Sequence, residues 1–282
     1  MIRIISPVLF IVFLFGQSSV EPKRNEVVSE RHSNGLKKLV LVFEGEGLDE
    51  VLVAKYGFYD NGLKSFIQSY KDNVLEGQST EWYENGMKKS EIFYKSNQSS
   101  GEARAWHPNG QLQAIGNALN GKGNGEYKEF NDQGEVIAEG VYRDDKKHDK
   151  WIEIDYKGNK SEGIYSNGKK NGSWIEIDSE SKRTESIYKN DVLEGKSTIF
   201  NANGTKQTEG DYSDGKKDGI WMTWYPTGEK FSEETYQYNK KNGTSTYWFK
   251  NGNYKAKETY KWGPKKYGLS TYWYESGILK SN

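Results

Sequence analysis

The chain has 282 residues, of which 34% are hydrophobic and 14% aromatic, and its mean hydropathy is −0.94. These values exclude a thick conventional core, and the 20 tyrosines and 9 tryptophans argue against a disordered chain, because disordered segments are poor in aromatic residues. The 40 basic and 40 acidic residues cancel, which argues against a nucleic-acid-binding protein, and the absence of cysteine excludes disulfides, thiolate metal sites and cysteine nucleophiles.

The N-terminus differs in character from the rest of the chain. Arg3 precedes an apolar run over 8–15, and Gly16 and Ser18 offer small residues for cleavage, as is typical of a secretory signal peptide. The run is shorter than the roughly 20 residues that a membrane-spanning helix needs. We expect a signal peptide over 1–18, a linker over 19–30 and an exported mature protein (periplasmic, cell-surface or secreted) without a transmembrane helix. The alternative is a cytoplasmic protein whose N-terminal segment is not cleaved.

Turn residues recur at a nearly constant spacing from residue 31 to 282. Each of the first members of the series lies 24 residues after the one before: Gly62, Gly86, Gly110, Gly134 and Gly158. The series continues with steps of 23 to 25 residues through Ser181, Gly204, Gly228, Gly252 and Gly277. Such self-similarity defines a repeat architecture.

A second residue that favours a break in the chain precedes each turn position by nine residues: Gly77, Gly101, Gly125, Asp149, Gly172, Gly195, Gly219, Gly243 and Gly268. The segment between the two positions predicts a short aromatic strand. A lysine- and glutamate-containing strand follows the turn and closes on tyrosine, with Ala118 as the exception. Asn-Gly turns between β-prone runs predict hairpins. We expect an all-β fold, an elongated single-layer antiparallel meander of about ten tandem hairpins over 31–282.

Two rows of residues are candidate binding surfaces. A large apolar residue stands five residues after each break, and six of the aromatic members form a candidate partner-binding row: Trp82, Trp106, Phe130, Trp224, Trp248 and Trp273. A single-layer sheet cannot cover all of these rings, so they either form a groove or stack on one another. Lysine pairs that precede the break form a candidate basic edge: Lys146, Lys147, Lys169, Lys170, Lys216, Lys217, Lys240, Lys241, Lys265 and Lys266. Such an edge could bind anionic lipid or only guard the turns.

The sequence offers no catalytic or metal-binding constellation. His32, His107 and His148 lie in different copies and share no repeat position. The glycine-rich segment 120–125 lacks the following Ser or Thr and the helix of a phosphate-binding loop. We therefore expect no enzyme and no cofactor.

The repeated pattern Tyr-x-x-Gly, then a lysine-rich strand ending in Tyr, then Gly-Lys-x-x-Gly-x-Trp resembles the MORN repeat, in particular the longer bacterial variant in proteins labelled antitoxins. The resemblance implies a twisted antiparallel meander that serves as a protein-interaction and membrane-recognition module. We expect a non-enzymatic scaffold that binds a partner protein, antitoxin-like, through its sheet face or edge. The alternatives are a cell-surface glycan-binding repeat protein and an anionic-lipid-binding array.

Overall fold

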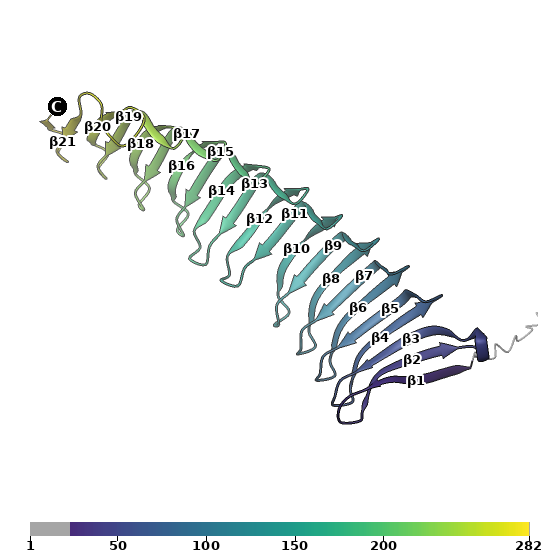
Figure 1. Ribbon diagram of the computed structural model, residues 1–282. Coiled ribbons are helices and arrows are strands. Elements are labelled where there is room, and N and C mark those ends of the chain that lie inside the picture. Colours follow the sequence, from purple (N-terminus) through teal and green to yellow (C-terminus); the bar gives the residue numbers. More distant parts are fainter. Residues whose placement is uncertain (1–22, 282) are drawn as a thin grey trace, which may run out of the picture.

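The computed structural model describes residues 23–281, which form one open antiparallel sheet of 22 strands. Each strand pairs with the strands before and after it in the chain, so that the sheet is a continuous meander. Figure 1 shows the hairpins side by side along a long twisted ribbon, with β1 near one end and β21 near the other. The all-β meander predicted from the sequence is confirmed, and the one helical element within 23–281 is the 3-10 turn η1 (Gly47–Asp49).

The strands are β1 (Arg24–Arg31), β2 (Lys37–Glu44), β3 (Val51–Phe58), β4 (Lys64–Lys71), β5 (Val74–Trp82), β6 (Lys88–Lys95), β7 (Gln98–Trp106), β8 (Leu112–Leu119), β9 (Lys122–Phe130), β10 (Val136–Arg143), β11 (Lys146–Ile154), β12 (Lys160–Ser166), β13 (Lys169–Ile177), β14 (Arg183–Lys189), β15 (Val192–Phe200), β16 (Lys206–Ser213), β17 (Lys216–Trp224), β18 (Lys230–Gln237), β19 (Lys240–Trp248), β20 (Tyr254–Tyr260), β21 (Thr271–Trp273) and β22 (Leu279–Ser281).

The array begins earlier than the sequence indicated. Strand β1 occupies most of the segment 19–30, for which a linker was expected, and pairs with β2 over seven residue pairs from Arg24 to Arg31. Its neighbour β2 carries two fully buried residues, Val40 and Val42. The signal peptide expected over 1–18 lies outside the described residues.

Four-residue turns line one long edge of the sheet, and side-chain hydrogen bonds join them. In the turn that ends at Gly86, the Asn85 side-chain oxygen accepts a hydrogen bond from the Met87 backbone at 3.0 Å. The Asn85 amide nitrogen donates to the carbonyl of Pro108, in the next turn of the series, at 2.8 Å. Equivalent asparagines make the same bridge at other turns: Asn61, Asn109, Asn203 and Asn251. These asparagines therefore both shape a turn and tie it to the next repeat.

Two-residue turns line the opposite edge. Asp72 and Asn73 have φ of 51° and 63°, and Asn167 and Gly168 have φ of 52° and 79°. Positive φ at both central residues defines the type I′ turn, whose twist suits a hairpin. These turns precede four of the five lysine pairs, which begin β11, β13, β17 and β19, whereas Lys265 and Lys266 lie between β20 and β21.

The second set of break residues lies inside strands from Gly77 to Gly243 and forms bulges there, whereas Gly268 precedes β21. In the β4–β5 ladder, Gln68 faces Ser79 and Tyr70 faces Leu75, which leaves three residues around Gly77 opposite one residue of β4. Gly77 has a φ of 94°, a value that glycine reaches without steric cost. A bulge bends its strand, and the strands in Figure 1 are visibly curved.

The bend gives the sheet two different faces. We define the ring face as the one that carries Trp151, Trp174 and Trp221, which are 1%, 1% and 3% exposed. The Trp151 indole donates a hydrogen bond to the Val141 carbonyl, opposite the bulge, at 3.0 Å, and the other two tryptophans bond in the same way. The alternate residues form the charged face, which carries cross-strand ion pairs such as Lys128 to Glu139.

Candidate functional site

The second lysine of each pair reaches onto the ring face. The Lys147 Nζ lies 4.5 Å from the centre of the Trp151 ring and 5.2 Å from that of Tyr165, and it forms an ion pair with Glu153. Strand β11 supplies the lysine, the tryptophan and the glutamate, and β12 supplies the tyrosine. The ammonium is thus enclosed by two rings and one carboxylate, an arrangement stabilised by the ring quadrupoles and by the opposite charge.

The same enclosure recurs along the rod. Lys170 lies 4.2 Å from the Trp174 ring and 5.1 Å from the Tyr188 ring, and its Nζ is 2.5 Å from a Glu176 oxygen. The remaining pairs send their second lysine over at least one ring in the same way: Lys217, Lys241 and Lys266. The first members stay exposed at the edge: Lys146, Lys169, Lys216, Lys240 and Lys265. The candidate basic edge therefore has half of its expected lysines.

Lys217 differs from the other enclosed lysines in its electrostatics. Thr223 stands where Glu153 and Glu176 stand in other copies, and the structure gives Lys217 no ion pair within 23–281. Burial lowers the pKa of Lys217, and the more distant Glu234 offsets this in part. The ammonium of Lys217 is held mainly by its contacts with rings.

The candidate aromatic row lies on the charged face, near the four-residue turns. Trp106, Trp224 and Trp248 are half-buried, and each has a lysine Nζ within 5.4 Å of its ring centre. The same three lysines form ion pairs with glutamates on that face: Lys88 with Glu91, Lys206 with Glu209 and Lys230 with Glu233. Trp82, Phe130 and Trp273 are also half-buried. Direct ring contacts occur at the C-terminal end, where Tyr254 lies between Trp248 and Trp273 at 6.0 and 5.5 Å.

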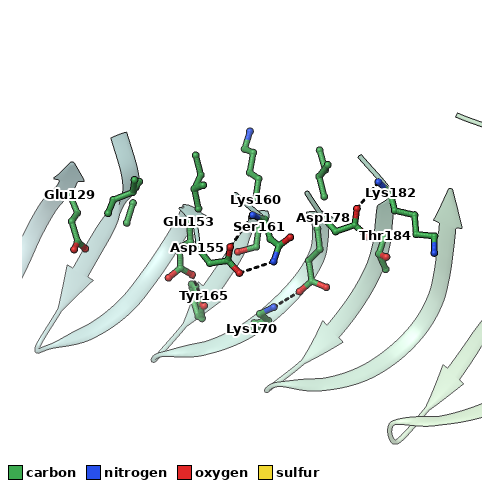
Figure 2. Close-up of a pocket in the computed structure, with 16 residues that line it drawn as sticks. Glu129, Glu153, Asp155, Lys160, Ser161, Tyr165, Lys170, Asp178, Lys182 and Thr184 are labelled. Carbon is green, nitrogen blue, oxygen red and sulfur yellow. Dashed lines mark hydrogen bonds and ion pairs between the residues drawn. The ribbon is translucent and has the colours of Figure 1, made fainter. Parts of the chain in front are cut away.

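Two open grooves follow one another on the ring face. The first, of about 490 Å³, runs from Ser90 to Asp145 and reaches a two-residue turn. The second, of about 710 Å³, runs from Glu129 to Thr184 and reaches the four-residue turns at Asp155 and Asp178. Figure 2 shows the second groove, with Glu153, Tyr165 and Lys170 projecting from the curved strands. The first is lined mainly by small apolar residues, and the second carries both acidic and basic groups.

Within 23–281 no group of three or more histidine or acidic residues is arranged to hold a metal ion. No helix among these residues is long and apolar enough to cross a membrane. The expectation that the histidines share no repeat position was wrong for His32 and His107, which each stand three residues before a turn glycine. Their Nε2 atoms lie 2.8 Å from the Phe58 carbonyl and 2.9 Å from the Phe130 carbonyl. The Tyr83 hydroxyl makes the equivalent contact with the Trp106 carbonyl at 2.8 Å.

The sequence did not single out the three buried tryptophans or the glycines beneath them. Trp151 lies on Gly140, Trp174 on Gly163 and Trp221 on Gly210. Each glycine stands two residues before the closing tyrosine of its strand, in the pattern Glu-Gly-x-Tyr. That pattern, combined with Gly-x-Trp at Trp174 and Trp221 and Asp-x-Trp at Trp151, was a signal that could have predicted the pairs.

A chain of tandem hairpins, each packed on its neighbours alone, is a β-repeat scaffold. Residues 75–96, 100–120, 217–238 and 241–261 match the family described as "MORN repeat variant". The resemblance predicted from the sequence is confirmed in these four segments, which match the MORN repeat variant. These matches do not extend to an antitoxin.

Other comparisons add little. No curated protein matches the sequence. Among solved structures, the crystal structure of TcdB2-TccC3-Cdc42 matches at a TM-score of 0.19 and 9% identity over 87% of this chain and 16% of that chain. The Photorhabdus luminescens Tc holotoxin pore with the TccC3-D651A mutation matches at a TM-score of 0.17 and 11% identity, over 85% and 15% of the two chains. The chain thus spans about a sixth of the length of these structures, and likenesses this weak carry no argument.

Proposed function

We propose that this protein is a non-enzymatic scaffold that binds a partner protein along the ring face. The observation that carries the proposal is the succession of two grooves across β6–β14, which together reach from one edge of the sheet to the other. Half-buried tyrosines line both grooves, and aromatic side chains are enriched in protein interfaces. MORN repeats are typically non-enzymatic, which agrees with a binding role.

The mixed charge of the second groove favours a protein over a lipid surface. Glu153 and Asp178 lie beside Lys160 and Lys182 along its length, so that a partner with both signs of charge can be matched. The exposed edge lysines share their edge with acidic turn residues, as Lys146 does with Asp144 and Asp145, which reduces the attraction for anionic lipid. Export, and neutralisation of a toxin by binding, remain predictions.

Capture of the partner with variants in each groove tests the proposal. The protein is used as bait in an extract of its own cells, and the captured protein is identified and titrated with the pure bait. Ala105→Trp fills the first groove and Ser161→Trp the second, while Thr246→Trp adds the same bulk to the charged face. We expect the groove variants to weaken binding at least tenfold and Thr246→Trp to leave it unchanged. Equal binding by all three, or retention on wall glycan or anionic vesicles in place of a protein, would contradict it.

A further inference from the structure

One copy of the repeat keeps the rings and the carboxylate of the enclosure but lacks the lysine. Lys147 and Lys170 each stand four residues before a tryptophan and six before a glutamate. Gly123 holds the same position relative to Tyr127 and Glu129. The sequence 121–123 reads Gly-Lys-Gly, where 168–170 and 215–217 read Gly-Lys-Lys and 145–147 reads Asp-Lys-Lys. The second ring of this copy is Tyr142, which closes β10 as Tyr165 closes β12.

The two tyrosines stand in the arrangement that encloses an ammonium elsewhere. The ring centres of Tyr127 and Tyr142 are 5.3 Å apart at an interplanar angle of 80°, against 6.3 Å and 90° for Trp151 and Tyr165, which hold Lys147. No lysine or arginine within 23–281 lies over either tyrosine, whereas every other pair of this kind has one. Trp151 contacts both rings, stacked on Tyr127 at 6.1 Å and edge-on to Tyr142 at 4.9 Å. The two rings therefore lack a cation, although one face of Tyr127 is covered by the indole.

The carboxylate of this copy also lacks its cation. The Tyr127 hydroxyl donates a hydrogen bond to Glu129 at 3.1 Å, and Glu129 forms no ion pair with another residue of the described chain. Burial raises the pKa of Tyr127, and the negative charge of Glu129 raises it further. The site is thus a partly desolvated negative centre beside two rings, which favours a cation.

A largely apolar channel leads to the two rings, whereas Glu129 lines the neighbouring second groove. The first groove is lined by Gly123, Tyr127 and Tyr142 at one end. Small residues of the preceding copy line much of the rest of it: Ala103, Ala105, Ala114, Gly116 and Ala118. Three charged residues also line the groove: Arg104, Glu126 and Asp145. Ala118 occupies the register where every other complete copy has a tyrosine. The missing tyrosine opens space beside the missing lysine, so that an alkyl chain fits where the lysine stem and ring stand in other copies.

We propose that Tyr127, Tyr142 and Glu129 form a binding site for a primary ammonium group on an unbranched alkyl chain. The ammonium lies over the two rings and toward the carboxylate, and the alkyl chain lies along the alanines of the groove. A primary ammonium suits the site better than a quaternary one, because it can donate a hydrogen bond to Glu129 as Lys170 does to Glu176. A free alkylamine and the lysine side chain of a partner offer the same chemistry, and the site does not depend on the proposed partner.

Calorimetric titration of the full chain tests the site with three probes. The probes are n-pentylammonium, a lysine-containing pentapeptide capped at both ends, and the same peptide with norleucine. We expect pentylammonium to bind, and the lysine peptide to bind at least about fivefold more tightly than its norleucine form, in line with a cation–ring contact. Tighter binding of the lysine peptide than of pentylammonium identifies a protein as the source, and the reverse identifies a free amine. Binding of neither cation would overturn the proposal.

Two substitutions locate the binding. Gly123→Lys restores the missing ammonium; the glycine lacks the positive φ that would make a side chain strained, and an added Cβ meets the Asp145 carboxylate at an ordinary 3.4 Å. We expect this variant to fold and to lose pentylammonium binding, and Glu129→Gln to weaken it at least fivefold. Leu193→Lys, at the same register of a copy without a tryptophan, is the matched control and should bind as the native chain does. Unchanged binding in both Gly123→Lys and Glu129→Gln would refute the site, whether or not partner capture succeeds.

Discussion

Trp151 lies so close to Gly140 that a Cβ added to the glycine would stand 2.3 Å from the indole ring. Real Cβ atoms do not approach other atoms so closely, so the glycine is required by packing. Its φ is not in the left-handed region, and turn geometry gives no other reason for it. The Trp151 ring thus packs directly on the Gly140 backbone, where no side chain intervenes.

Gly140→Ala should therefore destabilise the protein by about 1 to 3 kcal/mol, the usual range for overpacking a filled site. Gly123→Ala is a matched control, because its added Cβ meets its nearest neighbour at 3.4 Å. Urea unfolding followed by tryptophan fluorescence measures both. Equal midpoints for the two variants would show that the indole moves aside freely.

A second prediction separates the two sets of tryptophans. Trp151 is 1% exposed, and its removal leaves a cavity, so Trp151→Ala should cost about 3 to 5 kcal/mol. Trp224, on the charged face, is only half-buried, and Trp224→Ala should cost clearly less. Comparing the urea midpoints of the two variants tests this ranking, and a larger loss for Trp224→Ala would mean that the charged face holds the rod together.

The repeat was predictable because its period is carried by residues with a strong backbone preference. Asn85-Gly86 and its equivalents predicted the positions of the four-residue turns, and the tyrosines predicted where the strands end. The bulge was not predictable in the same way, since a glycine such as Gly77 suits a turn and a bulge equally well. The sequence therefore did not show that these glycines lie within strands. It also did not show which face of the sheet each side chain beyond the bulge occupies.

The bulge determines which face of the sheet each candidate residue occupies, because it shifts the alternation of side chains along its strand. The lysine pairs were predicted to line one edge, but alternation along β11 sends Lys147 to the ring face and leaves Lys146 at the edge. The exceptional Ala118 was visible in the sequence. The sequence did not show that Ala118 contributes to a site, because it pairs with Gly123 only across the β8–β9 ladder.

Asp149 is the one member of the bulge series within β5–β19 that is not glycine, and its φ is 60°. A left-handed conformation costs an L-residue roughly 1 kcal/mol, and aspartate tolerates it better than alanine does. The stability order should therefore be Gly, then Asp, then Ala at this position. The half-exposed ion pair between Asp149 and Arg143, at 2.7 Å, is lost in Asp149→Gly. This loss offsets part of the stability that the glycine adds. Thermal unfolding of Asp149→Gly and Asp149→Ala measures the order, and a more stable alanine variant would contradict it.

The last prediction concerns acid stability and rests on Glu234, whose side chain is 14% exposed. Burial by itself raises the pKa of Glu234, but hydrogen bonds from Lys241, Tyr247 and Tyr236 outweigh it and lower the pKa below the ordinary value of 4.5. A carboxylate with a lowered folded-state pKa stabilises the fold above its unfolded pKa, and this stability is lost as the pH falls through the folded value. Below pH 4.5 the native protein should thus lose part of its stability at this residue.

Glu234→Gln removes the charge and with it this part of the pH dependence. At pH 7 the variant should be less stable by about 1.5 to 3 kcal/mol, since it weakens hydrogen bonds to a charged group. Between pH 4.5 and 3 its melting temperature should fall less than that of the native protein, so that the two curves converge. Glu180→Gln, in an exposed turn, is the control and should follow the native curve throughout. Parallel curves for Glu234→Gln and the native chain would mean that Glu234 carries no acid sensitivity, and that the ring-face carboxylates are held by packing alone.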